Sequence, residues 1–212
     1  TGAVTVYDGK VYVPITGVNE ENSASSADYS CCTFRGSISA LDANNGAVLW
    51  KFYTVGEPQP RGTSANGKPL FGPAGVGIWS APTVDAKRGL IYAATGNAYA
   101  EPTPPTADAV IAISMDKGEL QWASQLTPGD AWIGGCNAEN PNCPDAIGPD
   151  FDFSASPILI TNSAGKDLLV VPQKSGMAYG LDPDNSGALL WQYRAGAGSA
   201  VGGVWGAAVA GD

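Results

Sequence analysis

The sequence of 212 residues contains no histidine. This absence excludes Ser–His–Asp hydrolysis, Cys–His proteolysis and histidine-ligated zinc among the residues of this chain. A general base in this chain must therefore be a carboxylate, a lysine or a tyrosine.

Basic residues are also scarce. The chain has 11 Lys and Arg against 20 Asp and Glu, which gives a net charge of −9, and the basic residues form no run. Because phosphate groups are bound by clustered Lys and Arg, this composition argues against nucleic acid and anionic membrane surfaces as partners. The sequence also lacks a stretch of about 18 apolar residues, so it predicts no membrane-spanning segment.

Glycine and proline, by contrast, are abundant. The 28 Gly and 16 Pro are typical of many short strands and tight turns, and a hydrophobic content of 44% suffices for a core. The N-terminus shows no basic region followed by an apolar stretch, so no signal peptide is visible. Both ends lie within strand-like patterns, with Val204–Ala210 resembling an opening strand, so we expect a piece of a longer chain.

A repeated pattern organises the chain. Three segments with a glycine turn and a short closing run end at Trp50, Trp122 and Trp191, roughly 70 residues apart. Each is preceded by an earlier hairpin pattern, over residues 4–13, 81–94 and 156–171. Two hairpins make a four-stranded antiparallel unit, which is the blade of a β-propeller. A large tryptophan face would dock between neighbouring sheets that cannot bury their faces alone.

We therefore predict an all-β fold of consecutive four-stranded antiparallel blades. The predicted blades cover residues 1–56, 72–126 and 150–196, with the start of a further blade at 200–212. Two polar segments between the hairpin patterns predict surface loops, Asn19–Asp28 and Pro58–Pro69.

The hairpin over residues 81–94 carries a candidate ligand site. Two short apolar runs are joined by a polar, glycine-ended turn, which indicates antiparallel strands. In such a pair the start of one strand lies beside the end of the other, so Trp79 and Asn97 should lie at the same end. A flat aromatic face and an amide oxygen could bind a ligand there. The alternative is a core tryptophan and a turn asparagine.

The closing motif, Ala-x-Asp-x-x-x-Gly-x-x-x-Trp at residues 40–50, resembles the propeller repeat of quinoprotein alcohol dehydrogenases. Within that family, Gly77–Tyr99, Cys31–Gly36 and Thr127–Trp132 are most similar to members that act on polyvinyl alcohol. The resemblance covers nearly the whole chain. It implies part of an eight-bladed propeller, of which this chain would hold roughly three blades, and it implies pyrroloquinoline quinone (PQQ) and calcium as cofactors.

The resemblance assigns three further roles. Trp79 matches the family tryptophan that stacks on the quinone, and Asn97 matches a metal ligand that follows Thr-Gly. Lys174 matches a cation that reaches the quinone carbonyls, where it would stabilise developing negative charge. The alternative for Lys174 is a solvated lysine in a turn.

The same resemblance places the catalytic base. The family's base is an Asp between aromatic residues that follows a Gly-Asp and a Trp. Here the pattern is split, because Gly129–Trp132 carries the first half and Phe151–Phe153 carries the second half after an insertion. We therefore assign the base to Asp152, which would also bind the metal and would point away from its aromatic neighbours in a regular strand. Asp130 and Asp150 are second candidates, with solvated loop carboxylates as the alternative.

Four cysteines complete the list of candidates. Cys31 and Cys32 are adjacent, and the residues alone leave open a vicinal disulfide or two independent thiols. The family carries a vicinal disulfide against the cofactor, which implies cofactor-binding roles for both, although Cys31 stands where members place a metal-binding glutamate. Cys136 and Cys143, seven residues apart in a Pro/Asn loop, predict a local disulfide rather than zinc, which would lack ligands.

The function implied is oxidation of alcohol groups by the quinone, with electrons passing to a cytochrome c. For polyvinyl alcohol the carbinols are secondary, so the product would be a ketone. Paired cysteines favour an oxidising compartment, and with the family they imply the bacterial periplasm. The alternatives are a dehydrogenase of small alcohols in the same family and a non-catalytic propeller scaffold.

Overall fold

The computed structural model describes residues 2–137, 139–198 and 206–208. The all-β prediction is confirmed, because the described helices are limited to α1 (Val18–Ser23) and the short 3₁₀ turn η1 (Pro183–Asn185). Within these residues no helix is long and apolar enough to cross a bilayer. The predicted start of a further blade at residues 200–212 lies largely outside the described residues.

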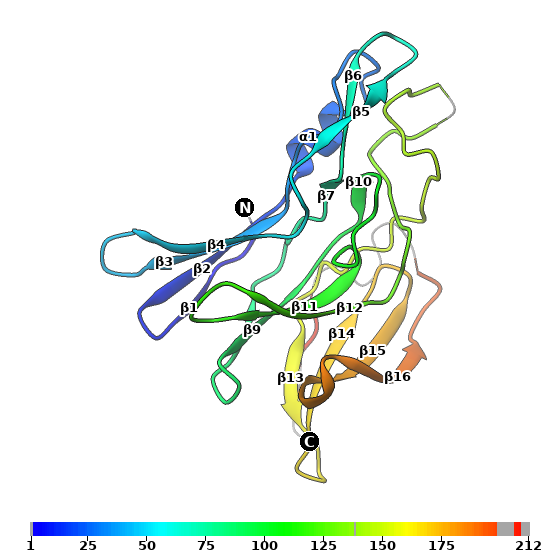
Figure 1. Ribbon diagram of the computed structural model, residues 1–212. Coiled ribbons are helices and arrows are strands. Elements are labelled where there is room, and N and C mark those ends of the chain that lie inside the picture. The colour runs from blue at the N-terminus through cyan, green and yellow to red at the C-terminus, as the bar shows by residue number, and fades with distance from the viewer. Residues whose placement is uncertain (1, 138, 199–205, 209–212) are drawn as a thin grey trace.

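Three four-stranded antiparallel sheets follow one another along the chain (Figure 1). The first sheet contains β1 (Thr5–Tyr7), β2 (Lys10–Ile15), β3 (Ser37–Asp42) and β4 (Val48–Tyr53). The second contains β8 (Thr83–Asp85), β9 (Leu90–Ala94), β11 (Ala109–Ser114) and β12 (Leu120–Gln125). The third contains β13 (Ile158–Thr161), β14 (Asp167–Pro172), β15 (Met177–Asp182) and β16 (Ala188–Arg194). In each sheet the strands lie side by side in the order in which they occur along the chain, as in the blades of a propeller.

The closing turn of each sheet has a local physical cause. The Asp42 carboxylate accepts the Asn44 backbone N–H at 2.7 Å, and the Gly46 N–H returns to the Asp42 carbonyl at 2.8 Å. Gly46 has φ +74°, a conformation that glycine adopts without steric cost. Asp182 and Gly187 make the same bonds in the third sheet, with one more residue between them. An Asp followed four or five positions later by Gly therefore encodes the turn in these two sheets.

The repeat tryptophans join neighbouring sheets. The Trp50 ring lies against Gly118 in the closing turn of the second sheet, where a Cβ would come within 2.5 Å of the ring. Its Nε1–H also donates to the Met115 carbonyl at 3.1 Å. Trp122 contacts Gly187 of the third sheet in the same way. The docking role predicted for the closing tryptophans is thus seen twice.

The middle sheet contributes to two cores through alternating side chains. Ile111 and Ile113 of β11 lie in a buried cluster that includes Tyr12 and Ile38 of the first sheet. Their neighbours Val110 and Ala112 lie in a second cluster with residues of the third sheet, including Leu169 and Leu181. Since successive side chains of a strand point to opposite faces, a continuous apolar run is what this central strand requires.

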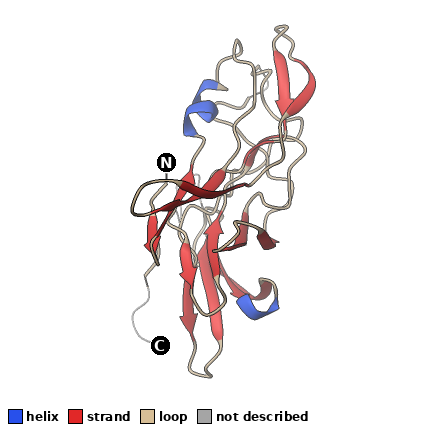
Figure 2. Ribbon diagram, turned by 60° about the vertical axis from the view of Figure 1, so that its left-hand side comes forward, coloured by secondary structure: helices blue, strands red, loops and turns tan. Residues whose placement is uncertain are grey.

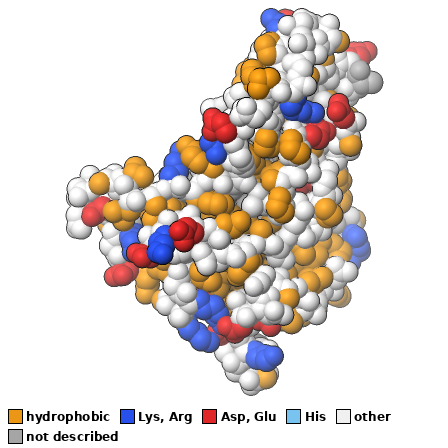
Figure 3. Space-filling view, in the orientation of Figure 1, with side chains coloured by type: hydrophobic (Ala, Val, Ile, Leu, Met, Phe, Trp, Pro, Cys, Tyr) orange, Lys and Arg blue, Asp and Glu red, His pale blue; other side chains and the backbone are white. Residues whose placement is uncertain are grey.

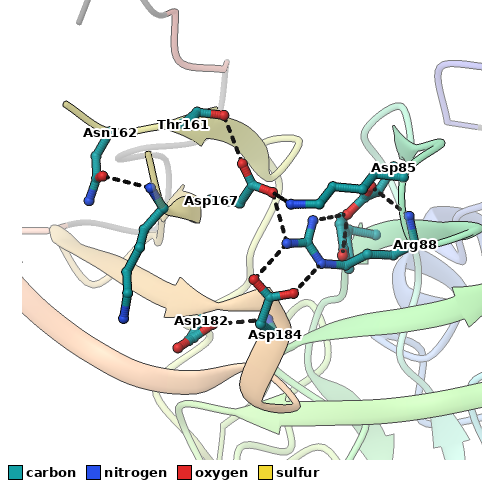
Figure 4. Close-up of polar contacts among 10 residues, drawn as sticks. Asp85, Arg88, Thr161, Asn162, Asp167, Asp182 and Asp184 are labelled. Carbon is teal, nitrogen blue, oxygen red and sulfur yellow. Dashed lines mark hydrogen bonds and ion pairs between the residues drawn. The ribbon is translucent and has the colours of Figure 1, made fainter. Parts of the chain in front are cut away.

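An ion-pair cluster fastens the second sheet to the third (Figure 4). Arg88, in the turn before β9, pairs with Asp85 at 2.7 Å and with Asp167 and Asp184 of the third sheet at 2.8 Å. Tyr92 also donates its hydroxyl to Asp85 at 2.8 Å. On the face drawn in Figure 3, basic and acidic side chains are interspersed rather than gathered by sign.

Both segments predicted as loops carry structure. Residues 18–23 form α1, in which the Ala24 N–H donates to the Glu20 carbonyl at 2.8 Å. Residues 59–72 form a hairpin of β5 (Gln59–Thr63) and β6 (Pro69–Gly72), which extends from the sheets beside α1 (Figures 1 and 2). A last pair, β7 (Ala74–Gly75) and β10 (Ala98–Ala100), links this end to the sheets. The loop predictions failed because contacts distant in sequence stabilise these segments: Glu20 of α1 accepts the backbone N–H groups of Thr33 and Phe34, and Phe71 of β6 exchanges backbone hydrogen bonds with Cys31 and Cys32.

Candidate active site

The backbone brings the central candidates to one end of the second sheet. The Gly96 N–H donates to the Gly77 carbonyl at 2.9 Å, and the Val76 N–H donates to the Asn97 carbonyl at 2.8 Å. The segment before β8, which carries Trp79, therefore runs beside the segment after β9, which carries Asn97. This is the arrangement that the hairpin predicts.

Asn97 is held with its amide oxygen free. Its side chain is 3% exposed, and Nδ2 donates to the carbonyls of Ala98 at 2.6 Å and Trp132 at 2.7 Å. Both amide hydrogens are thus used, and Oδ1 accepts no hydrogen bond from the part of the chain that the structure describes. An amide oxygen that no protein group donates to is a suitable ligand for a hard cation.

Asp152 lies directly beside Asn97 and is 1% exposed. Its Oδ1 accepts the Asn97 backbone N–H at 2.7 Å, and its Oδ2 accepts from the Lys174 ammonium. Gly96 makes room for it, because a Cβ there would lie 2.5 Å from Oδ1. The backbone at 151–154 is irregular rather than a strand, and Phe153 is as buried as Asp152. The predicted strand geometry around Asp152 is therefore wrong, since the strand begins at Ile158.

Lys174 is buried, with 6% exposure, so the solvated alternative is wrong. Its Nζ pairs with Asp152 and with Asp150, the latter at 3.0 Å. The same Nζ lies 4.9 Å from the centre of the Trp79 ring, within the range of a cation–π contact. Burial lowers the pKa of Lys174, but the two carboxylates outweigh it and the pKa is raised. Lys174 therefore stays charged and joins Trp79 to Asp152.

Asp130 and Asp150 are buried as well, so neither is a solvated loop carboxylate. Asp130 accepts the backbone N–H groups of Asp150 at 3.2 Å and Phe151 at 2.7 Å, and so shapes the segment before Asp152. Burial raises the pKa of Asp130, and these two bonds oppose the shift. Burial and the nearby Asp152 charge raise the pKa of Asp150 to about 8, against the opposing effect of Lys174.

Both cysteine pairs are bonded. Cys31 and Cys32 form a vicinal disulfide, so the alternative of independent thiols is wrong, and the predicted Cys136–Cys143 disulfide is confirmed. Cys31 and Cys32 are buried in a cluster that includes Tyr99, two residues after Asn97. The vicinal disulfide thus reaches the candidate site through Tyr99, and the contacts described do not join it to Trp79 or Lys174.

Sequence reasoning missed two acidic groups near this site. Asp108 is fully buried, and neither carboxylate oxygen has a hydrogen-bond partner among the described residues. Burial, and then the charges of Asp152 and Asp130, raise its pKa well above the usual value. Glu21 on α1 lies near Tyr99, and no signal marked it because its segment was predicted as a loop. The one signal for Asp108 in the sequence was its position directly before the apolar run of β11.

The donor set fits a quinone and a hard cation. Asn97 Oδ1 and the Asp152 carboxylate are the oxygen ligands that calcium prefers, and the ammonium of Lys174 shows that a positive charge is stabilised at this carboxylate. The face of Trp79 and the adjacent Lys174 suit a planar, electron-accepting ring with carbonyl groups. No three His, Cys, Asp or Glu side chains gather as a metal site within the described residues, so a cation would need further ligands.

Comparisons with known proteins show what this chain is similar to. The family model described as "PQQ: Glucose/ethanol/alcohol dehydrogenase, beta-propeller domain" matches residues 6–194. Polyvinylalcohol dehydrogenase of a Pseudomonas species is 48% identical over 205 residues, which are 96% of this chain and 32% of that protein. Polyvinylalcohol dehydrogenase of Sphingopyxis sp. (strain 113P3) is 45% identical over 208 residues, with the same coverage of 96% and 32%. The chain thus spans about a third of the length of these relatives.

Two solved structures share the fold. Europium-containing methanol dehydrogenase has a TM-score of 0.62 at 22% identity, over 92% of this chain and 33% of that chain. Quinohemoprotein alcohol dehydrogenase from Comamonas testosteroni has a TM-score of 0.61 at 23% identity, over 92% of this chain and 28% of that chain. These two structures share the fold, and the family model, which matches most of the chain, shows that the chain belongs to the β-propeller domain family of PQQ-dependent glucose, ethanol and alcohol dehydrogenases.

Proposed function

We propose that this chain carries the cofactor-binding and catalytic residues of a PQQ-dependent dehydrogenase that oxidises secondary alcohol groups, with polyvinyl alcohol as substrate. The observation that carries the proposal is the contact chain Trp79–Lys174–Asp152–Asn97, which joins an aromatic face, a buried cation, a carboxylate and an amide. The two polyvinylalcohol dehydrogenases supply the substrate class, because they are 48% and 45% identical to this chain.

Each residue has a defined task. When bound, the quinone supplies oxidising power and calcium supplies a Lewis acid. Trp79 would hold the ring plane, and Lys174, whose Nζ lies 4.9 Å from the centre of the Trp79 ring, would donate hydrogen bonds to the ring oxygens. Asn97 Oδ1 and Asp152 hold the cation. Asp152 also takes the hydroxyl proton of the alcohol as the general base.

The surrounding residues position this group. Asp130 fixes the backbone on the N-terminal side of Asp152 by accepting two N–H groups, and the Lys174 N–H donates to the Asp152 carbonyl at 3.1 Å. Phe153 packs on Tyr179 with ring centres 5.7 Å apart. The vicinal disulfide Cys31–Cys32 supports the cofactor from the Tyr99 side. The backbone is thus held on both sides of Asp152, and the packing of Phe153 holds it further. A catalytic base needs such support, because it must keep its position relative to the substrate.

The wider assignment follows from the same relatives and from the cysteines. A secondary alcohol would yield a ketone, and a cytochrome c would accept the electrons. All four cysteines are disulfide-bonded, which favours an oxidising compartment, and we assign the protein to the bacterial periplasm.

The test is a titration of the whole protein with PQQ in the presence of CaCl2, followed by absorbance and by reduction of an artificial electron-accepting dye. We expect dye reduction that requires the quinone and that is faster with polyvinyl alcohol or pentane-2,4-diol than with ethanol. A preference for ethanol would replace the substrate by a small primary alcohol. Absence of quinone-dependent dye reduction with every alcohol would instead indicate a non-catalytic propeller.

A further inference from the structure

Helix α1 carries two adjacent carboxylates with different surroundings. Glu20 accepts the backbone N–H groups of Thr33 at 2.8 Å and Phe34 at 2.6 Å, and the hydroxyl of Tyr29 at 2.9 Å. These bonds hold the backbone that follows the vicinal disulfide. They use the acceptor capacity of Glu20, so this carboxylate is committed to structure.

Glu21, the next residue, is largely uncommitted. Among the described residues its carboxylate accepts one hydrogen bond, from the Tyr99 hydroxyl to Oε2, and the 3.3 Å distance is long for an O–H donor. An ionised carboxylate offers about four acceptor positions. The side chain is half-buried, so most of these positions have neither a protein donor nor full access to water.

The contacts of Glu21 place it beside the residues that hold Asn97. Tyr99 is buried and follows Asn97 by two positions, at the β-bulge between Ala98 and Ala100. On the other side, a Cβ at Gly134 would lie 3.5 Å from the Glu21 carbonyl, and Gly134 follows Trp132, whose carbonyl accepts the Asn97 amide. Glu21 thus bonds to Tyr99 through its side chain, and its backbone lies beside the segment that carries Trp132.

A third contact ties α1 to the Trp79 side of the site. The Glu21 N–H donates to the Gly17 carbonyl at 3.1 Å, so Glu21 lies one helical turn from Gly17. A Cβ at Gly77 would lie 3.5 Å from the Gly17 nitrogen and 3.0 Å from Nε1 of Trp79. The start of α1 therefore lies against the indole over which Lys174 is placed.

Electrostatics agree with this position. Burial raises the pKa of Glu21, the Asp152 charge raises it further, and Lys174 lowers it. The charges of both central residues therefore act on the Glu21 carboxylate. Asp152 shares its carboxylate with Lys174, so a divalent cation at Asn97 and Asp152 would be short of negative charge.

We propose that Glu21 is the second carboxylate ligand of the cation that Asn97 and Asp152 hold. The inference rests on the proposed function, because that function supplies the cation. Calcium takes six to eight oxygen ligands. A carboxylate from α1 completes a set of one amide and two carboxylates, and cofactor oxygens or water can fill the remaining positions. Family members place a metal-binding glutamate at the position of Cys31. In this chain the carboxylate would come from α1 instead, so the cation site does not need a glutamate at position 31.

The test is binding of Ca²⁺ and of luminescent Tb³⁺ to the whole apoprotein, measured by calorimetry and by Tb³⁺ emission sensitised by Trp79. Glu21→Gln should weaken Ca²⁺ at least 10-fold and should reduce the Tb³⁺ emission at a fixed cation concentration. Glu21→Asp should retain part of the affinity, because a shorter carboxylate keeps the charge.

Two controls remove the same charge elsewhere. Glu20→Gln weakens the bonds to Thr33 and Phe34, and Glu119→Gln alters an exposed turn, so both should leave Ca²⁺ affinity within about twofold. Unchanged affinity in Glu21→Gln would overturn the inference and leave the proposed function standing. An equal loss in Glu20→Gln would show that α1 acts only through its fold. Absence of saturable cation binding to the unaltered protein would overturn the cation site itself and this inference with it.

Discussion

The three sheets and the segment 127–156 satisfy their backbone hydrogen-bonding groups in opposite ways. In the sheets, backbone groups pair along ladders between neighbouring strands, and side chains are left to fill the two cores. In 127–156 the described residues form no extended strand, and side chains hold the backbone instead. Asp130 accepts two N–H groups of that segment, and Asn140 and Asn142 donate to the carbonyl of Ala24.

This difference explains where the polar chemistry gathers. A ladder satisfies its own hydrogen bonds and needs no buried charge, whereas an irregular buried backbone needs polar side chains beside it. Those side chains, Asp130 and Asp150, surround Asp152 at the centre of the site. Regular sheets should therefore govern stability and the irregular segment should govern catalysis, and three substitutions test that division.

The largest effect is expected from Asp152→Asn in the whole protein. Turnover should fall about 100-fold or more, the usual loss when a general base is removed. Quinone affinity should stay within severalfold, because Trp79 and Asn97 remain. Steady-state kinetics and quinone titration measure the two quantities. If Asp152→Asn keeps near-normal turnover while Asp130→Asn or Asp150→Asn abolishes it, the base lies elsewhere in this segment.

The next effect concerns the sheets. Trp122→Ala should lower the free energy of unfolding by about 3–5 kcal/mol, because it removes the contacts of the indole with Gly187 of the third sheet and with Tyr92 of its own sheet. Urea denaturation measures this change. Gln121→Ala, an exposed neighbour on β12, should change stability by less than about 0.5 kcal/mol. Loss of quinone affinity in the folded Trp122 variant would break the proposed division between sheet and segment.

The smallest effect is expected from Asp108, which lies between the two regions. Its pKa is raised in the folded state, so the folded protein binds this proton more tightly than the unfolded chain does. The resulting stability is present below about pH 4, the unfolded pKa, and is lost as the pH rises through the folded pKa.

Asp108→Asn cannot lose that proton, so it should be more stable than the unaltered protein at pH 8 by about 1 kcal/mol, a usual size for one substitution. The advantage should shrink at pH 5. Thermal unfolding at both pH values measures it, and an advantage of equal size at pH 5 and pH 8 would show that Asp108 is not the titrating group.

The sheets were predictable because their signals are local. The glycine turn and closing tryptophan are encoded within about 11 residues, and the alternation of β2 or the apolar run of β11 shows in the sequence itself. The Cys136–Cys143 bond was also predictable from a short spacing. These features depend on neighbours in the chain, which a single sequence displays.

The remainder depends on contacts distant in sequence. Helix α1 forms where Glu20 finds the backbone of Thr33 and Phe34, and Asp130 is buried because its partners come 20 residues later. The ion pair that buries Lys174 spans 22 residues to Asp152. A segment rich in Ser and Asn carries no pattern that announces such partners. The roles of Trp79, Asn97, Asp152 and Lys174 stay predictions until the titrations above are done.

The contact between each closing tryptophan and the glycine of the following turn sets the unit in which such a chain can be shortened or lengthened. Trp50 packs against Gly118, and Trp122 packs against Gly187, so the two residues of each contact belong to different repeats. Removing one whole repeat would present Trp50 with Gly187, an equivalent surface. A cut that keeps the tryptophan of one repeat and removes the glycine turn of the next leaves the indole ring exposed, without the surface on which it packs. Duplication and recombination should therefore preserve this architecture when their breakpoints are one full repeat apart.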